Sequence, residues 1–312
     1  MQPLYLVTGG AGFIGSHIVE GLIKKGERVR VIDNLSTGKR ENLELLMDEI
    51  EFIQGDLRDP KATAQAVKGV DFIFHQAAVP SVPRSIEDPL GSTENNLNGT
   101  LHLLMAASDA KVKRLVYASS SSVYGDSPAL PKREDFLPAP LSPYAVSKLA
   151  GEYYCQVFHQ LYGLETVSLR YFNVFGPRQD PLSPYAAVIP KFITLALAKK
   201  PLAVYGDGKQ SRDFSFVADV VEANFLACRA KDIAGEEFNV GSGKQTSLNQ
   251  LVQALREIIG ADLKVEYTEP QPGDVRHSLA SIEKARRLMG FAPKIPFGEG
   301  LHRTAAWFKA TA

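Results

Sequence analysis

The sequence predicts an α/β fold, with a doubly wound parallel sheet and a smaller α/β lobe. Two observations lead to this expectation. Short runs of β-branched and apolar residues alternate with longer amphipathic segments through the first half of the 312-residue chain, as in strands joined by right-handed crossover helices. Several predicted strands are apolar at nearly every position, which indicates a sheet covered by helices on both faces.

The predicted elements of the first half follow this alternation in order. The strands are expected at 4–9, 28–33, 51–56, 71–77, 114–120 and 165–172. The helices are expected at 14–25, 60–68, 93–109 and 144–162, and a polar loop follows the second strand. Ligands of such sheets lie in the crevice at the carboxyl ends of the strands, so functional residues are expected there.

The regular alternation of predicted strands and helices ends after Phe172. A loop with four prolines precedes a predicted helix at 191–199, and a glycine turn follows that helix. The remaining predicted elements are helices at 218–230 and 247–259, strands near 236–242 and 264–267, and two terminal helices. We therefore expect residues 173–312 to form a substrate-binding lobe that closes over the first domain.

Composition and charge exclude several classes of function. Thirty-five basic and 35 acidic residues leave no net charge, and no long run of like charge occurs, which argues against a nucleic-acid partner. No stretch of about eighteen uninterrupted apolar residues predicts a membrane span. The start of the chain lacks the pattern of a signal peptide, so a cytoplasmic location is expected. Cys155 and Cys228 have no metal-type spacing and the histidines are scattered, so reduced thiols and no metal site are expected.

The segment "VTGGAGFIGSH" follows the first predicted strand and opens a helix. Gly9, Gly12 and Gly15 are spaced three apart, which permits a tight turn and places a pyrophosphate on the helix N-terminus. Asp33 ends the second strand, where a carboxylate binds ribose hydroxyls and repels a 2′-phosphate, so NAD is favoured over NADP. Asp56 follows the third strand and fits either an adenine contact or a helix cap. Residues 1–172 are thus interpreted as an NAD-binding Rossmann domain, with later segments at about 214–242 packing back on it.

The segment "SPYAVSK" places Tyr144 and Lys148 four residues apart in a predicted helix. Residues at this spacing share one helix face, so the ammonium is expected to lower the pKa of the phenol and make Tyr144 a base near neutral pH. The alternative is a surface pair without function. Tyr205 and Lys209 have the same spacing, but glycines between them break a helix.

Four serines, 119–122, stand at the end of the predicted strand "RLVYASS". Taken alone, they fit a polar loop that caps a strand. Because the strand ends at the ligand edge of the sheet, their hydroxyls are also placed where one of them could bridge Tyr144 to a substrate alcohol.

These motifs together resemble the extended short-chain dehydrogenase/reductases, and within them the nucleotide-sugar epimerases. The resemblance runs along essentially the whole chain and includes "TGGAGFIGSH", "GDLRD", "HQAAVPSVPRS", "SSSSVYG", "SPYAVSK", "RYFNVFGPRQ" and "GDVRHSLASIEKA". It implies tightly bound NAD and C4 epimerisation of a UDP-hexose through a transient 4-keto sugar. The substrate pair it implies first is UDP-GlcNAc and UDP-GalNAc, with UDP-Glc and UDP-Gal as further candidates.

The resemblance also implies roles for individual residues. The catalytic residues would be Ser120, Tyr144 and Lys148. Cofactor contacts would be made by Gly9, Gly12, Phe13, Ile14, Gly15, Asp33, Asn34, Ser36, Gly38, Asp56, Leu57, Gln76, Ala77, Ala78, Asn96, Tyr144, Lys148 and Phe172. Substrate contacts would be made by Ser81, Val82, Arg84, Ser120, Ser122, Asn173, Val188, Tyr205, Arg212, Asp274 and Ser278. Ser119 and Ser121 would point away or contact the cofactor.

Two positions bear on the substrate. Many relatives carry an arginine where this chain has Gln271, so diphosphate binding is expected to depend more on Arg212. The alternative interpretation of Arg212 is an exposed loop residue that pairs with Asp213 or Asp207. Ser278 matches a bulky tyrosine of glucose- and galactose-restricted epimerases. This small residue is expected to leave room for a 2-acetamido group.

Other reactions of the fold remain as alternatives. A 4,6-dehydratase needs an acid pair at the positions of Ser121 and Ser122, and a UDP-glucuronate epimerase or decarboxylase needs a cation for the carboxylate. A non-catalytic NAD-sensing protein is disfavoured by the intact Tyr144 and Lys148. The resemblance further implies a homodimer through the helices at 93–109 and 144–162, which would form a four-helix contact.

Overall fold

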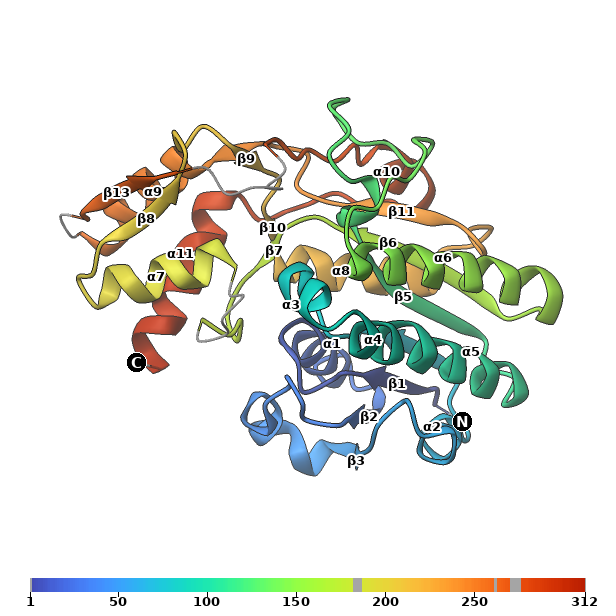
Figure 1. The fold of residues 1–312 in the computed structure, drawn as a ribbon. Coiled ribbons are helices and arrows are strands. Elements are labelled where there is room, and N and C mark those ends of the chain that lie inside the picture. The colour runs from blue at the N-terminus through green and yellow to red at the C-terminus, as the bar shows by residue number, and fades with distance from the viewer. Residues whose placement is uncertain (1, 182–186, 261–262, 270–275, 312) are drawn as a thin grey trace.

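A seven-stranded parallel sheet forms the centre of the computed structural model, which describes residues 2–181, 187–260, 263–269 and 276–311. The strand order is β11-β6-β5-β4-β1-β2-β3 (Figure 1), so the predicted doubly wound parallel sheet is confirmed. The strands are β1 (Leu4–Thr8), β2 (Arg28–Asp33), β3 (Ile50–Gln54), β4 (Phe72–His75), β5 (Arg114–Ser120), β6 (Glu165–Tyr171) and β11 (Glu237–Val240).

Helices cover both faces of this sheet. The helices of the domain that contains this sheet are α1 (Phe13–Ile23), α2 (Pro60–Val67), α3 (Val82–Glu87), α4 (Pro89–Thr93), α5 (Gly99–Asp109), α6 (Pro143–Tyr162), α8 (Val217–Arg229) and α10 (Glu283–Met289). Side chains alternate along β1: Leu4 and Leu6 pack with α2, α5 and α6, whereas Tyr5 and Val7 pack with α1 and α8. The near-continuous apolar character of the strands is explained by this burial on two sides.

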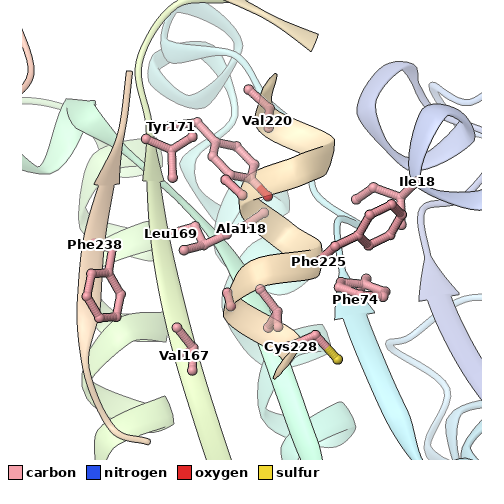
Figure 2. Packing of buried hydrophobic residues seen from close by; sticks show 14 of the residues in the cluster. Ile18, Phe74, Ala118, Val167, Leu169, Tyr171, Val220, Phe225, Cys228 and Phe238 are labelled. Atoms are coloured by element: carbon pink, nitrogen blue, oxygen red, sulfur yellow. The ribbon is translucent and has the colours of Figure 1, made fainter. Parts of the chain in front are cut away.

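Helix α8 fills the face opposite α6, although it comes late in the sequence. Its Phe225 packs between Ile18 of α1 and Phe74 of β4 (Figure 2). Burial of one such aromatic side chain stabilises a fold by about 1.5–3 kcal/mol. The division of the chain into a first domain at 1–172 and a second lobe at 173–312 remains a proposal.

Helix α6 has well-defined ends and a close contact with β5. The Ser142 side chain accepts a hydrogen bond from the Ala145 N–H at 3.1 Å, and Gly163 ends the helix in the left-handed region with φ of 70°. A Cβ atom at Gly151 would come within 2.2 Å of the Tyr117 hydroxyl, so this glycine lets the helix approach the strand. The helix predicted at 144–162 is confirmed, and it carries Tyr144 and Lys148 over the end of β5.

The second lobe packs around its own core. Helices α7 (Val188–Leu197), α9 (Leu248–Ile259) and α11 (Phe297–Thr311) surround buried side chains that include Phe192, Leu251 and Leu301. Its short strands pair as β13 (Val265–Thr268) with β8 (Leu202–Tyr205), β12 (Thr246–Ser247) with β9 (Ser211–Arg212), and β10 (Ser215–Phe216) with β7 (Val174–Phe175). No helix among the described residues is long and apolar enough to cross a membrane.

Several local predictions differ from the structure. The helix expected at 93–109 consists of the π-helical turn η2 (Glu94–Asn98) followed by α5 (Gly99–Asp109). The segment expected to be a polar loop after β2 contains a 3₁₀ helix, η1 (Arg40–Glu49). Helix α7 begins at Val188 rather than 191, because a proline is tolerated in the first turn of a helix. Strand β8 was not predicted, because its four residues form a strand only through pairing with the distant β13.

Candidate active site

The three predicted catalytic residues lie together where β5 meets α6. The Ser120 side chain interacts with the Tyr144 hydroxyl and favours its phenolate form. The Lys148 Nζ atom lies 5.9 Å from the centre of the Tyr144 ring and donates to the Ala118 carbonyl oxygen at 2.8 Å. Tyrosine, serine and lysine thus converge at the carboxyl edge of the sheet, as their sequence positions predicted.

The electrostatics of this group differ from the prediction. Burial raises the pKa of Tyr144 above its usual value of 10.0, and the hydrogen bond with Ser120 opposes that shift. Burial also lowers the pKa of Lys148 to about 8, against the raising influence of Cys155 and Glu152. The expectation that Lys148 lowers the pKa of Tyr144 is therefore wrong for this arrangement, in which the ammonium is bonded to Ala118 and desolvation dominates.

The hydroxyl groups of Ser119, Ser120 and Ser122 differ in their contacts. The Ser120 hydroxyl accepts from the Ser122 N–H at 3.2 Å and meets Tyr144, whereas Ser119 donates to the carboxylate of Glu152. The Ser122 hydroxyl oxygen is buried without a hydrogen-bond partner among the described residues. A buried unpaired hydroxyl is unfavourable in a folded protein. This supports the prediction that Ser122 contacts a substrate, which remains a prediction.

The turn between β1 and α1 has the properties of a phosphate site. Gly9 has φ of +66°, and its carbonyl accepts from the Gly12 N–H at 3.0 Å. A Cβ atom at Gly15 would come within 2.2 Å of the Gly9 oxygen. Helix α1 begins at Phe13 with no side-chain cap and no acidic residue in its first turn. The free N–H groups and the positive end of the helix dipole fit the pyrophosphate of a dinucleotide.

The ends of β2 and β3 add carboxylates to this turn. The buried Asp33 accepts from the N–H groups of Ala11 at 3.0 Å and Leu35 at 2.8 Å, and burial raises its pKa. Asp56 accepts from Asn34 at 2.9 Å and is paired with Arg58 at 2.8 Å. The helix-cap alternative for Asp56 is wrong, because the capping carboxylate of α2 is that of Asp59.

The predicted cofactor residues that follow β4 and β6 lie in polar clusters. The Gln76 amide donates to the Tyr171 hydroxyl at 3.1 Å and to Asn224 of α8 at 3.2 Å. Asn96 lies in the π-helical turn η2 (Glu94–Asn98) and accepts from the Val79 N–H at 2.7 Å. The other predicted cofactor residues are placed along the same edge or next to the glycine turn: Ile14, Ser36, Gly38, Leu57, Ala77, Ala78 and Phe172.

The sequence did not single out His75, which ends β4. Its ring lies 2.7 Å from the Thr8 hydroxyl through Nδ1 and 2.8 Å from the Thr100 hydroxyl through Nε2. Thr100 donates its proton to the Asn96 carbonyl at 2.6 Å, so it accepts from His75 Nε2–H. Burial lowers the pKa of His75 to about 3. This histidine is a neutral structural bridge, and its only sequence signal was its place at a strand end.

The predicted substrate residues of the second lobe surround β9. Arg212 Nη1 donates to the Ser211 carbonyl at 3.0 Å, and the Ser278 N–H donates to the same oxygen at 3.1 Å. Asp213 accepts from Ser242, Gly243 and Ala280, which draws the segment at 276–281 against β9. The other predicted residues of this side are Asn173, which precedes β7, Val188, at the start of α7, and the half-exposed Tyr205. Asp274 and Gln271 lie outside the described residues.

Three predicted substrate residues lie at the start of α3. The Ser81 hydroxyl accepts from the Arg84 N–H at 3.1 Å and so caps α3, with Val82 as the first residue of the helix. Arg84 lines a cavity of about 450 Å³ together with Asn34 and Ser36. The structure thus places Arg84 beside two residues that are predicted to bind the cofactor.

A glycine turn, a carboxylate ending β2 and a tyrosine–lysine pair on α6 define a dinucleotide-dependent enzyme of the extended short-chain dehydrogenase/reductase class. The sequence model of the NAD dependent epimerase/dehydratase family matches residues 5–241, and the chain belongs to this family. Its cofactor is NAD.

Similar proteins cover the whole chain. A putative UDP-glucose 4-epimerase of Methanocaldococcus jannaschii is 40% identical over 308 residues, 98% of each chain. A UDP-glucuronate 4-epimerase of Thermodesulfobacterium geofontis is 38% identical, over 98% of this chain and 96% of that one. The solved structure of a UDP-N-acetylglucosamine 4-epimerase from Methanobrevibacter ruminantium, in complex with UDP-N-acetylmuramic acid, has a TM-score of 0.95, 42% identity and full coverage of both chains.

The glycine turn gives a direct test of the cofactor site. Gly15→Ala should abolish NAD binding, because the added Cβ atom meets backbone at 2.2 Å and forces the turn open. The measurement is the NAD released from the purified, denatured protein. Gly298→Ala is the matched control, since nothing lies within 4 Å of its Cβ position. Equal NAD content in the Gly15 variant and the control would contradict the assignment.

Proposed function

We propose that the protein interconverts the C4 epimers of a UDP-hexose through a transient 4-keto sugar, with UDP-GlcNAc and UDP-GalNAc as its preferred pair. The observation that carries this proposal is the convergence of Ser120, Tyr144 and Lys148 at the sheet edge that also bears the glycine turn. The three relatives described above are each named as a 4-epimerase of a UDP-sugar, which supports the same reaction.

The proposed chemistry assigns each residue one task. Ser120 orients the 4-hydroxyl of the sugar, and the Tyr144 phenolate removes its proton and later returns it. NAD held by the glycine turn at Gly9, Gly12 and Gly15 and by Asp33 would supply a reversible hydride acceptor for C4. Lys148 stabilises the phenolate. Its pKa of about 8 keeps it mostly charged at neutral pH, and turning its Nζ from Ala118 toward the phenol would lower the pKa of Tyr144.

One competing reaction, 4,6-dehydration, lacks the side chains that it needs. Dehydration requires an acid and a carboxylate near C5 and C6, whereas Ser121 and Ser122 occupy the corresponding positions. Epimerisation of a uronate requires recognition of a carboxylate. It is retained as an outcome of the substrate assay below, because one of the relatives is named for it.

Tyr144→Phe should reduce turnover by about a thousandfold or more while NAD stays bound, because the base is removed and the ring is kept. The assay is conversion of UDP-sugar without added cofactor, with NAD content measured on the same sample. Tyr162→Phe, at the exposed end of the same helix, is the matched control. Near-normal turnover in the Tyr144 variant would refute its role as the base.

The acetamido preference depends on the small side chain of Ser278, a partly buried residue held against β9. Ser278→Tyr should lower turnover of UDP-GlcNAc by about tenfold or more relative to UDP-Glc, because the ring fills the space for the acetamido group. Each protein is incubated with UDP-Glc, UDP-GlcNAc and UDP-GlcA separately. Equal losses on the first two sugars would count against the preference, and conversion of UDP-GlcA alone would replace it with a uronate activity.

We also propose a homodimer through α5 and α6. Leu161, Met105 and Val157 are large apolar side chains of these two helices that are 74%, 52% and 40% exposed. The helices lie side by side on one face of the molecule (Figure 1), so a second copy would complete a four-helix contact.

Sedimentation or light scattering should give a mass of roughly twice 34.1 kDa, and Val157→Asp should give monomers, because a charge is costly inside an apolar interface. Leu45→Asp is the control, since Leu45 is 95% exposed and lies outside the two helices. A monomeric wild-type protein would rule the dimer out.

A further inference from the structure

Three consecutive residues of β5 each contact a different residue of α6. The Ala118 carbonyl accepts from Lys148, the Ser119 hydroxyl donates to Glu152, and the Ser120 side chain interacts with that of Tyr144. The residues on the helix are spaced four apart, at 144, 148 and 152, and so follow one face of α6. The middle contact is the one of the three that involves no predicted catalytic residue.

Glu152 is fixed from several sides. It is 1% exposed and accepts from Arg170 of β6 twice, at 3.0 Å to Oε1 and 2.8 Å to Oε2, in addition to Ser119. Arg170 is itself buried, and its remaining Nη1 donates to the Tyr124 hydroxyl at 2.8 Å. Both oxygens of the carboxylate are therefore directed toward fixed donors on two strands.

The chain of hydrogen bonds continues into the segment that carries Ser278. The Tyr124 hydroxyl donates to Asn239 Oδ1 at 2.8 Å. The Asn239 amide donates to the Lys132 carbonyl at 2.9 Å and to the Ser281 carbonyl at 3.2 Å. The buried ion pair thus connects β5, α6 and β6 with the loop at the substrate side.

A buried ion pair is weak evidence for stability, because desolvation of the charges offsets their attraction and apolar replacements are often neutral. What a buried, bidentate pair does supply is geometry. Tyr144 and Lys148 lie in the first two turns of α6, whose N-terminal residues have few backbone partners. Glu152 follows Lys148 by one turn and is held by a buried ion pair with Arg170.

We propose that Ser119, Glu152 and Arg170 form a positioning triad that holds α6 in register with β5, so that Ser120, Tyr144 and Lys148 keep their mutual geometry during turnover. The role in turnover rests on the proposed epimerase function. It has a chemical reason there: the same tyrosine must remove and return a proton for both epimers while the keto sugar turns, and small displacements of reacting groups cost large factors in rate.

The triad also sets the charge that Lys148 faces. The titratable groups packed against Lys148 are His75 on β4, Tyr117 on β5, and Tyr144, Glu152 and Cys155 on α6. Burial lowers the pKa of His75 to about 3 and raises those of Tyr117, Tyr144 and Cys155, so these four are neutral near pH 7. Glu152 is the charged member of the group, and it helps to keep Lys148 protonated.

The central test is Ser119→Ala, which removes one contact of the triad and leaves Glu152 with both bonds from Arg170. The kcat per bound NAD should fall by about tenfold, with the KM for the UDP-sugar and the unfolding temperature nearly unchanged, because only the register of the reacting groups is loosened. Ser215→Ala is the matched control, since Ser215 is a buried serine whose hydroxyl has no partner among the described residues. A kcat equal to that of the wild type and the control would overturn the triad.

A second readout does not need epimerase activity. The titration of Tyr144 is followed by phenolate absorbance, as the difference between each protein and its Tyr144→Phe counterpart. In the Ser119→Ala protein this titration should move upward by about half a unit, because the phenolate loses well-placed partners. An unmoved titration overturns the triad, whereas a wild-type protein that converts no UDP-sugar refutes the proposed function alone.

Glu152→Gln supplies a second variant with the same shape. Because Glu152 raises the pKa of Lys148, its neutralisation should move the alkaline limb of the kcat profile to lower pH, by about half a unit. A variant that merely unfolds more easily would lose active protein without moving this limb. An unchanged limb in folded Glu152→Gln protein would also overturn the proposal.

Discussion

The contact between α6 and the last residues of β5 is the constraint on which the site depends. Gly151 lets the helix approach Tyr117 closely, since any Cβ atom there would meet the hydroxyl at 2.2 Å. The approach brings the Lys148 ammonium to the Ala118 carbonyl and the Tyr144 hydroxyl to the end of the strand. A helix packed even slightly farther away would carry the same residues without bringing them together.

The parallel sheet extends this constraint to the rest of the site. Because all seven strands run in one direction, the glycine turn after β1, Asp33 after β2 and Gln76 after β4 lie on the edge that Ser120 also reaches. The second lobe brings Ser278 toward the same edge through the segment that Asp213 holds against β9. A cofactor and a sugar nucleotide can thus be bound by residues from opposite ends of the chain.

Burial has two effects on this chemistry. It makes each hydrogen bond and charge in the site stronger than in water, and it raises the pKa of Tyr144 while lowering that of Lys148. The helical spacing of these residues predicted their proximity correctly but the direction of the Tyr144 shift wrongly. The spacing indicates which groups are neighbours, whereas the direction of the pKa shift of Tyr144 depends on how much water the surrounding chain excludes from its hydroxyl.

The sequence by itself determined the doubly wound sheet, the glycine turn, Asp33 and the tyrosine–lysine pair, because strand alternation, helix spacing and turn geometry are local properties of the backbone. Only the tertiary structure decided the partner of Ser119, the burial of the Glu152–Arg170 pair and the existence of β8. Each of these depends on segments far apart in the chain, such as β8 and β13, whose pairing leaves no local pattern. The four serines illustrate this difference. Their position at the end of a strand could be predicted from the sequence, but their hydrogen-bond partners were decided by tertiary packing.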